Sequence, residues 1–186
     1  MQILALSGSL REASYNTALA RAAADLAPLG VVVELYEGLG LLPLYDQDLD
    51  EGGVEVPYSV VDLRERIEAA DALLIVTPEY NGSIPGVLKN AIDWASARHR
   101  GSSLKNKTVA IAGVTTGQYG AIWAQQDLRK VLGISGARVM AGDLPVSRAN
   151  QVFDESGVLA DPFVAERLRE HVAALASEAA PLAIAA

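Results

Sequence analysis

The segment from Leu73 to Trp94 constrains the fold more than any other part of the sequence. It begins with the apolar run LLIV, reaches Thr77-Pro78, continues through the polar stretch EYNGS and becomes a helical pattern at Ile84-Pro85. Proline suits the first turn of a helix, where its missing N–H costs no hydrogen bond, and Ser83 is the predicted N-cap. The pattern predicts a strand, a tight loop and a helix N-terminus, an arrangement that favours anions and planar rings. An ordinary strand-to-helix connection is the alternative.

Apolar segments alternate with helical patterns along the whole chain. The predicted strands are 2–7, 31–36, 72–76, 108–114 and 137–140, and the predicted helices are 17–26, 59–70, 85–96, about 121–132 and 162–178. Residues 37–55 are expected to be irregular, and the Ala-rich tail from about 179 to be disordered. Apolar strands that alternate with helices form parallel sheets covered on both faces. The sequence therefore predicts an α/β, flavodoxin-like three-layer sandwich in one domain (1–186), with a five-stranded parallel sheet in the order 2-1-3-4-5.

The loops richest in Gly, Ser, Thr and Asn follow the first, third and fourth predicted strands. The predicted strand order places all three at one end of neighbouring strands, so a single ligand could contact them together. The first loop, GSLREASYN, runs into a helix N-terminus and is suited to a phosphate monoester. Its candidate ligand-binding side chains are those of Ser9, Arg11, Ser14, Asn16 and Thr17. A polar loop that only caps the helix is the alternative.

Two other nucleotide-binding patterns do not match the first loop. A Walker loop needs a second glycine followed by lysine, and a dinucleotide clamp needs GxGxxG, whereas Gly8 stands alone. We therefore expect the terminal phosphate of a mononucleotide. The second loop, Pro78-Glu79-Tyr80-Asn81, and the third, Thr115 to Gly120, would hold a flat ring. Asn81 and Gly82 tolerate unusual backbone angles, and Gly117 and Gly120 allow close approach of the backbone.

Composition removes several classes of function. The chain has no cysteine, which excludes disulfides, thiolate catalysis and CxxC redox chemistry, so redox work would need a bound cofactor. A net charge of −8 without a basic, aromatic stripe argues against nucleic acid as a partner. No apolar run approaches the ~18 residues of a membrane-spanning helix, and the N-terminus lacks the basic region of a secretory signal. The sequence thus predicts no membrane association and a cytoplasmic location.

Several other conspicuous residues are predicted to have no catalytic or metal-binding role. His99 and His171 lie in helix-end or helix-surface contexts. The acidic residues at 46, 48, 50 and 51 lack the EF-hand pattern, so they are expected to form a solvated loop near a subunit contact. Trp94 and Trp123 are expected to be packing or interface anchors.

The motifs SGSLREASYN, PEYNGSIPGVLKNAIDW and TTGxxG together resemble the NADPH-dependent FMN reductase family, which includes chromate/quinone reductases and some azoreductases. The likeness spans about residues 1–150. It implies a flavodoxin-like fold, tightly held FMN and a homodimer or homotetramer. It also implies that the phosphate and ribityl chain are held by Ser9, Arg11, Ser14, Asn16 and Thr17, and that the isoalloxazine is lined by Pro78, Glu79, Tyr80 and Asn81, with Thr115, Thr116 and Gly117 near its pyrimidine side. Residues 118–121 depart from the family, where many members have a second glycine pair.

The activity that this resemblance implies is that of an FMN-dependent NAD(P)H oxidoreductase. Hydride would pass from NADPH or NADH to FMN and then to a small acceptor, a quinone, flavin, azo compound or metal oxyanion, by a ping-pong route. No catalytic side chain is expected, because the flavin carries the chemistry. Two alternatives stay open: a flavodoxin-like FMN electron carrier without nicotinamide chemistry, which the charge of −8 also fits, and an interaction module that has lost its ligand.

Overall fold

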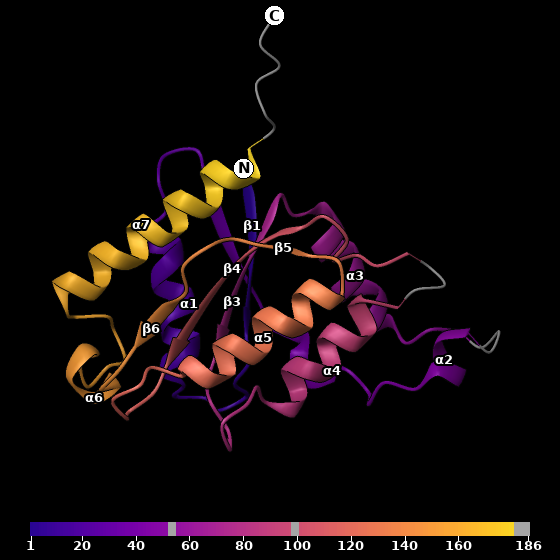
Figure 1. Ribbon diagram of the computed structural model, residues 1–186, viewed down its shortest axis with the longest axis horizontal. Helices are drawn as coiled ribbons and strands as arrows, with labels where there is room; N and C mark the ends of the chain where they lie inside the picture. The colour runs from indigo at the N-terminus through magenta and orange to yellow at the C-terminus, as the bar shows by residue number, and fades with distance from the viewer. Residues whose placement is uncertain (52–54, 98–100, 181–186) are drawn as a thin grey trace, which may run out of the picture.

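The computed structural model describes residues 1–51, 55–97 and 101–180. Within these ranges one parallel sheet is formed by β1 (Gln2–Ser7), β2 (Val32–Tyr36), β3 (Ala72–Thr77), β4 (Thr108–Val114), β5 (Arg138–Val139) and β6 (Leu144–Val146). The strand order is β2-β1-β3-β4-β5, with β6 also paired to β4 (Figure 1). The predicted order and the predicted flavodoxin-like fold are therefore confirmed.

The prediction of five strands missed β6. β5 pairs with Thr108 and Val109, whereas β6 pairs with the segment from Ala112 to Val114, so two short strands share one position beside β4. Gly142, with a φ of 80°, lies in the connection between them. Pro145 lies inside β6, and proline within an apolar run argues against a strand. The expected strand 137–140 is accordingly shortened to β5 (Arg138–Val139). The rest of the edge of β4 pairs with β6, a strand that the sequence pattern did not predict.

Helices cover both faces of the sheet (Figure 1). On one face lie α1 (Tyr15–Asp25) and α7 (Pro162–Ala179); on the other lie α3 (Tyr58–Ala69), α4 (Gly86–Ala95) and α5 (Ile122–Ile134). Alternate residues of β1 feed the two cores, because Ile3 and Ala5 pack with α1 and α7 while Leu4 packs on the opposite side. The short elements η1 (Gly38–Leu41), α2 (Gln47–Glu51) and α6 (Ala149–Val152) lie in the connections. Across the described ranges, no helix combines the length and the apolar character needed to cross a membrane.

The acidic segment 46–51 matches the predicted solvated loop only in part, because Asp46, Asp48 and Glu51 are exposed but residues 47–51 form the helix α2. Asp50 on α2 is buried, and its two carboxylate oxygens accept hydrogen bonds from Arg64 at 2.9 and 3.0 Å. Arg64 also donates to the carbonyl of Trp94, whose indole N–H donates to the carbonyl of Pro43 at 2.8 Å. Trp94 is fully buried, so its predicted packing role is confirmed. A buried carboxylate needs such a partner, and the pair therefore fixes this segment against α4.

His171 was predicted to lie on a helix surface, and it is buried instead. Its Nε2 lies 3.0 Å from the carbonyl oxygen of Ile111 in β4, so that nitrogen carries the proton. Ile111 belongs to the stretch of β4 between the residues paired with β5 and those paired with β6. The side chain of His171 on α7 thus donates a hydrogen bond to the carbonyl of Ile111, in the part of β4 where the pairing with β5 has ended and the pairing with β6 has not begun. His99 and the tail from 181 to 186 lie outside the described residues, and the helix that precedes the tail continues to Ala179.

Candidate functional site

The loops after β1, β3 and β4 meet at the carboxyl-terminal edge of the sheet, the lower edge in Figure 1. A crevice of about 190 Å³ lies between them. Nine of the twelve predicted site residues line it: Ser9, Arg11, Ser14, Asn16, Pro78, Glu79, Tyr80, Thr115 and Thr116. The structure thus brings three loops that are distant in sequence to one place beside β1 and β3, where doubly wound folds bind ligands.

The first loop supplies hydrogen-bond donors and positive charge to this crevice. Ser14 is the N-cap of α1, and its hydroxyl accepts a hydrogen bond from the N–H of Thr17 at 3.4 Å. Arg11 is exposed, with its guanidinium carbon 5.7 Å from the centroid of the Tyr15 ring. Hydroxyl groups, a guanidinium and a helix N-terminus are the groups that bind a phosphate dianion. The residues of this loop therefore fit the phosphate end of a flavin mononucleotide.

Two predicted residues of the first loop hold the scaffold together. Asn16 is buried, its amide group donates to the carbonyl of Val114 at 3.0 Å, and its oxygen accepts from the N–H of Val114 at 2.9 Å. The side chain thus ties α1 to the end of β4. The hydroxyl of Thr17 lies 2.8 Å from that of Ser7, and Thr17 lines an adjoining crevice instead of the first one.

The second loop contains a tight turn. Tyr80 and Ser83 exchange backbone hydrogen bonds of 3.0 and 3.1 Å, while Asn81 and Gly82 have φ values of 53° and 76°. Positive φ at both central residues is typical of a type I′ turn, which confirms the expectation of unusual backbone angles. The predicted N-cap is wrong: α4 starts after Pro85, and the Ser83 hydroxyl donates to the Asp127 carboxylate at 2.7 Å. Asn81 lies outside the crevice lining.

The third loop is fixed against β6 and α6. The N–H of Thr115 donates to Val146, and the carbonyl of Gly117 accepts from the N–H of Arg148 at 2.8 Å. Gly120 has a φ of 58°, and a Cβ there would lie 2.7 Å from the nitrogen of Val146. Strand β6 therefore accounts for the glycine at 120, which the sequence had assigned to close approach of a ligand. Gly117 lies outside the crevice lining, whereas Thr115 and Thr116 contribute to it.

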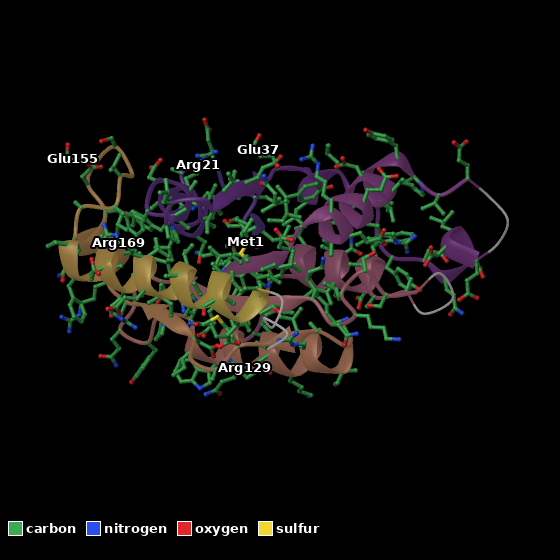
Figure 2. All side chains as sticks on the ribbon, turned by 90° about the horizontal axis from the view of Figure 1, so that it is seen from above. Met1, Arg21, Glu37, Arg129, Glu155 and Arg169 are labelled. Carbon is green, nitrogen blue, oxygen red and sulfur yellow. The ribbon has the colours of Figure 1, made fainter. Side chains whose placement is uncertain are left out.

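An adjoining crevice of about 420 Å³ shares Ser9 and Arg11 with the first. It extends toward the exposed ion pair between Arg21 and Glu37, whose charged atoms are 3.5 Å apart. Figure 2 shows these two side chains at the same edge of the molecule. Sequence reasoning also missed Tyr15 as a lining residue. Its place between Ser14 and Asn16 in the SYN motif was the available signal.

Comparison with known proteins decides the family. The family model described as NADPH-dependent FMN reductase matches residues 1–151. The chain belongs to this family. It is 41% identical over 176 residues to an NAD(P)H-dependent FMN reductase of Pseudomonas aeruginosa, covering 94% of this chain and 93% of that one. It is 42% identical over 142 residues to a quinone reductase of Escherichia coli, covering 75% and 73%.

A solved structure extends this likeness to three dimensions. FerB, a flavoenzyme NAD(P)H:(acceptor) oxidoreductase from Paracoccus denitrificans, superposes with a TM-score of 0.85 at 34% identity, covering 96% of each chain. The predicted family, the flavodoxin-like fold and the oxidoreductase class are thus confirmed. FMN and a nicotinamide nucleotide, the predicted cofactor and co-substrate, are those of the FMN reductase family.

Proposed function

We propose that this member of the FMN reductase family passes hydride equivalents from NADPH or NADH to a quinone-like acceptor by a ping-pong route. The observation that carries the proposal is the crevice at the ends of β1, β3 and β4, which combines phosphate-binding groups with walls suited to a planar ring. FMN, when bound, supplies the chemistry of accepting and donating hydride, which no side chain of this chain provides. The quinone class is supported by the name of the Escherichia coli relative.

The residues divide into two groups by their place along the crevice. Ser9, Arg11 and Ser14 would hold the phosphate and the ribityl chain, with the charge of Arg11 strengthening its hydrogen bonds. The segments 78–80 and 115–116 would bind the ring from two sides. Tyr80, at the edge of the crevice, is half exposed. An open face of the flavin beside it would allow the nicotinamide and the quinone to bind at the same place, one after the other. Sharing one place in turn is the structural requirement of ping-pong kinetics.

A second copy of the chain is part of this proposal. Tyr119 and Trp123 are about half exposed, with ring centroids 5.0 Å apart, and Trp123 directly follows the start of α5 beside the crevice. Exposed aromatic pairs are frequent anchors of protein interfaces. We therefore expect a homodimer or homotetramer in which a neighbouring subunit adds a wall to the site. Sedimentation that shows only monomer at micromolar concentration would contradict this expectation.

Anaerobic reduction tests the activity directly. Protein loaded with FMN should lose the absorbance of oxidised flavin when NADPH or NADH is added, and should regain it when a quinone follows. Steady-state rates at several quinone concentrations should give parallel double-reciprocal lines. If dithionite reduces the flavin and neither nicotinamide does, the protein is an electron carrier, a role that its net charge of −8 also fits. If the protein takes up no FMN at all, both the oxidoreductase function and the electron-carrier function are contradicted.

A further inference from the structure

Helix α5 begins without a capping side chain of its own. Its N-cap residue is Ala121, which has a φ of 61° and a methyl group that cannot accept a hydrogen bond. The first N–H groups of a helix need an acceptor from elsewhere. Here one carboxylate oxygen of Glu79, in the loop after β3, lies 3.1 Å from the nitrogen of Trp123 and 3.3 Å from that of Ala124. These are the N–H groups that an ordinary N-cap side chain would satisfy.

A second contact joins the same loop to the same helix. The Ser83 hydroxyl donates to the carboxylate of Asp127, one turn further along α5. Helix α5 also holds the end of the loop after β4, because Gln125 donates from its amide nitrogen to the carbonyl of Gly120 at 2.6 Å. The loops after β3 and β4, which form two walls of the crevice, are therefore connected through the first turns of α5.

Glu79 also determines the charge at this end of the helix. A carboxylate at a helix N-terminus offsets the positive end of the helix dipole. Because Glu79 lines the crevice as well, the N-terminus of α5 does not face a ligand with its positive end free. A reduced flavin ring that carries negative charge would meet the carboxylate of Glu79 in the same wall.

Resting on the proposed function, we propose that Glu79 is a positioning residue that joins two walls of the flavin crevice by capping α5, and that its charge disfavours the anionic, reduced state of the bound ring. This role differs from direct contact with the ring, the role that the family resemblance implies. It has two separable parts, the hydrogen bonds and the charge. Glu79→Gln keeps an oxygen that can accept from α5 and removes the charge, whereas Glu79→Ala removes both.

The hydrogen-bonding part is tested in the flavin-free protein by amide hydrogen exchange. In Glu79→Ala the N–H groups of Trp123 and Ala124 should exchange roughly fivefold faster, which corresponds to the loss of one helix cap. In Glu79→Gln they should stay close to the wild-type rates. Glu65→Gln, which removes the same charge from an exposed position on α3, is the matched control and should change neither rate. Unchanged exchange in Glu79→Ala would overturn the capping role.

The charge part is tested by the reduction potential of bound flavin. Glu79→Gln should favour reduced over oxidised FMN by several-fold relative to wild type, and the potential should rise accordingly. Glu65→Gln should leave the potential unchanged. A potential in Glu79→Gln equal to that of wild type would overturn the electrostatic role. A wild-type protein that binds no FMN would overturn the proposed function together with this electrostatic part, whereas the exchange experiment judges the cap independently of flavin.

Discussion

Arg11 supplies a positively charged side chain to the crevice, and it is exposed above the ring of Tyr15. We predict that Arg11→Ala weakens FMN binding by about 10- to 100-fold, the range expected when a charge-assisted hydrogen bond is lost. Affinity for riboflavin, which has no phosphate, should stay the same. Fluorescence titration of both ligands measures the difference. Arg21→Ala, in the adjoining crevice, is the matched control, and an equal loss in both variants would show that general charge accounts for the effect.

Asn16 gives a contrasting prediction, because its side-chain amide is hydrogen-bonded to both the N–H and the carbonyl of Val114. Asn16→Ala leaves a buried N–H and a buried carbonyl without their partner, which should cost about 2–4 kcal/mol of unfolding free energy in the flavin-free protein. Urea denaturation measures this loss. A residue that only gripped phosphate would leave the stability of the flavin-free protein unchanged, so an unaltered denaturation midpoint would contradict the scaffold role.

At the scale of elements, the sequence predicted what periodicity and turn chemistry encode. The strand–loop–helix unit around Pro78 followed from an apolar run, a turn and a proline, and the structure reproduces it. Asp50 and β6 could not be predicted this way. The burial of Asp50 depends on Arg64, which lies in another helix, and the pairing of β6 overrides the signal of Pro145. Likewise the acceptor at the start of α5 comes from Glu79, 44 residues before Trp123. Contacts between distant segments leave no local pattern.

The docking of α7 on the sheet depends on a titratable group. Burial lowers the pKa of His171 below its ordinary value of 6.5, although the hydrogen bond to Ile111 acts in the opposite direction. Just below pH 6.5, His171 is therefore protonated more often in the unfolded chain than in the folded protein. Its contribution to the free energy of unfolding rises with pH in this range and is lost as the pH falls. His171→Gln, which keeps an N–H donor and cannot take up a proton, should flatten this dependence.

Urea unfolding of the flavin-free protein at about pH 7.5 and about pH 5.5 measures that dependence on the two sides of the ordinary histidine pKa. The difference between wild type and His171→Gln isolates the histidine, because carboxylates that titrate in the same range contribute to both proteins. Asp143 and Arg167 act on His171 with opposite signs. Identical pH profiles of the two proteins would mean that His171 remains accessible to protonation in the folded state.

For the whole molecule, we propose that one domain unfolds as a unit and that FMN stabilises it by mass action. The two large cores are built on the two faces of one sheet, and a smaller cluster surrounds Trp94. Loss of either large core should expose the other. Unfolding of the flavin-free protein should follow a single transition by circular dichroism and by tryptophan fluorescence, to which the buried Trp94 contributes. Free FMN at 100 times its dissociation constant should then add about 2.7 kcal/mol to the free energy of unfolding.

This stabilisation would also connect the site to the fold, because FMN in the proposed crevice would contact loops that follow three different strands. The increment should depend on FMN concentration logarithmically and leave the denaturant slope unchanged, since the same surface is exposed on unfolding. In Arg11→Ala the same increment should require about 10 to 100 times more FMN, in line with its weaker binding. Separate transitions for the two probes would contradict a single domain. A single transition whose midpoint does not change with FMN concentration would contradict an FMN site at the carboxyl ends of the central strands.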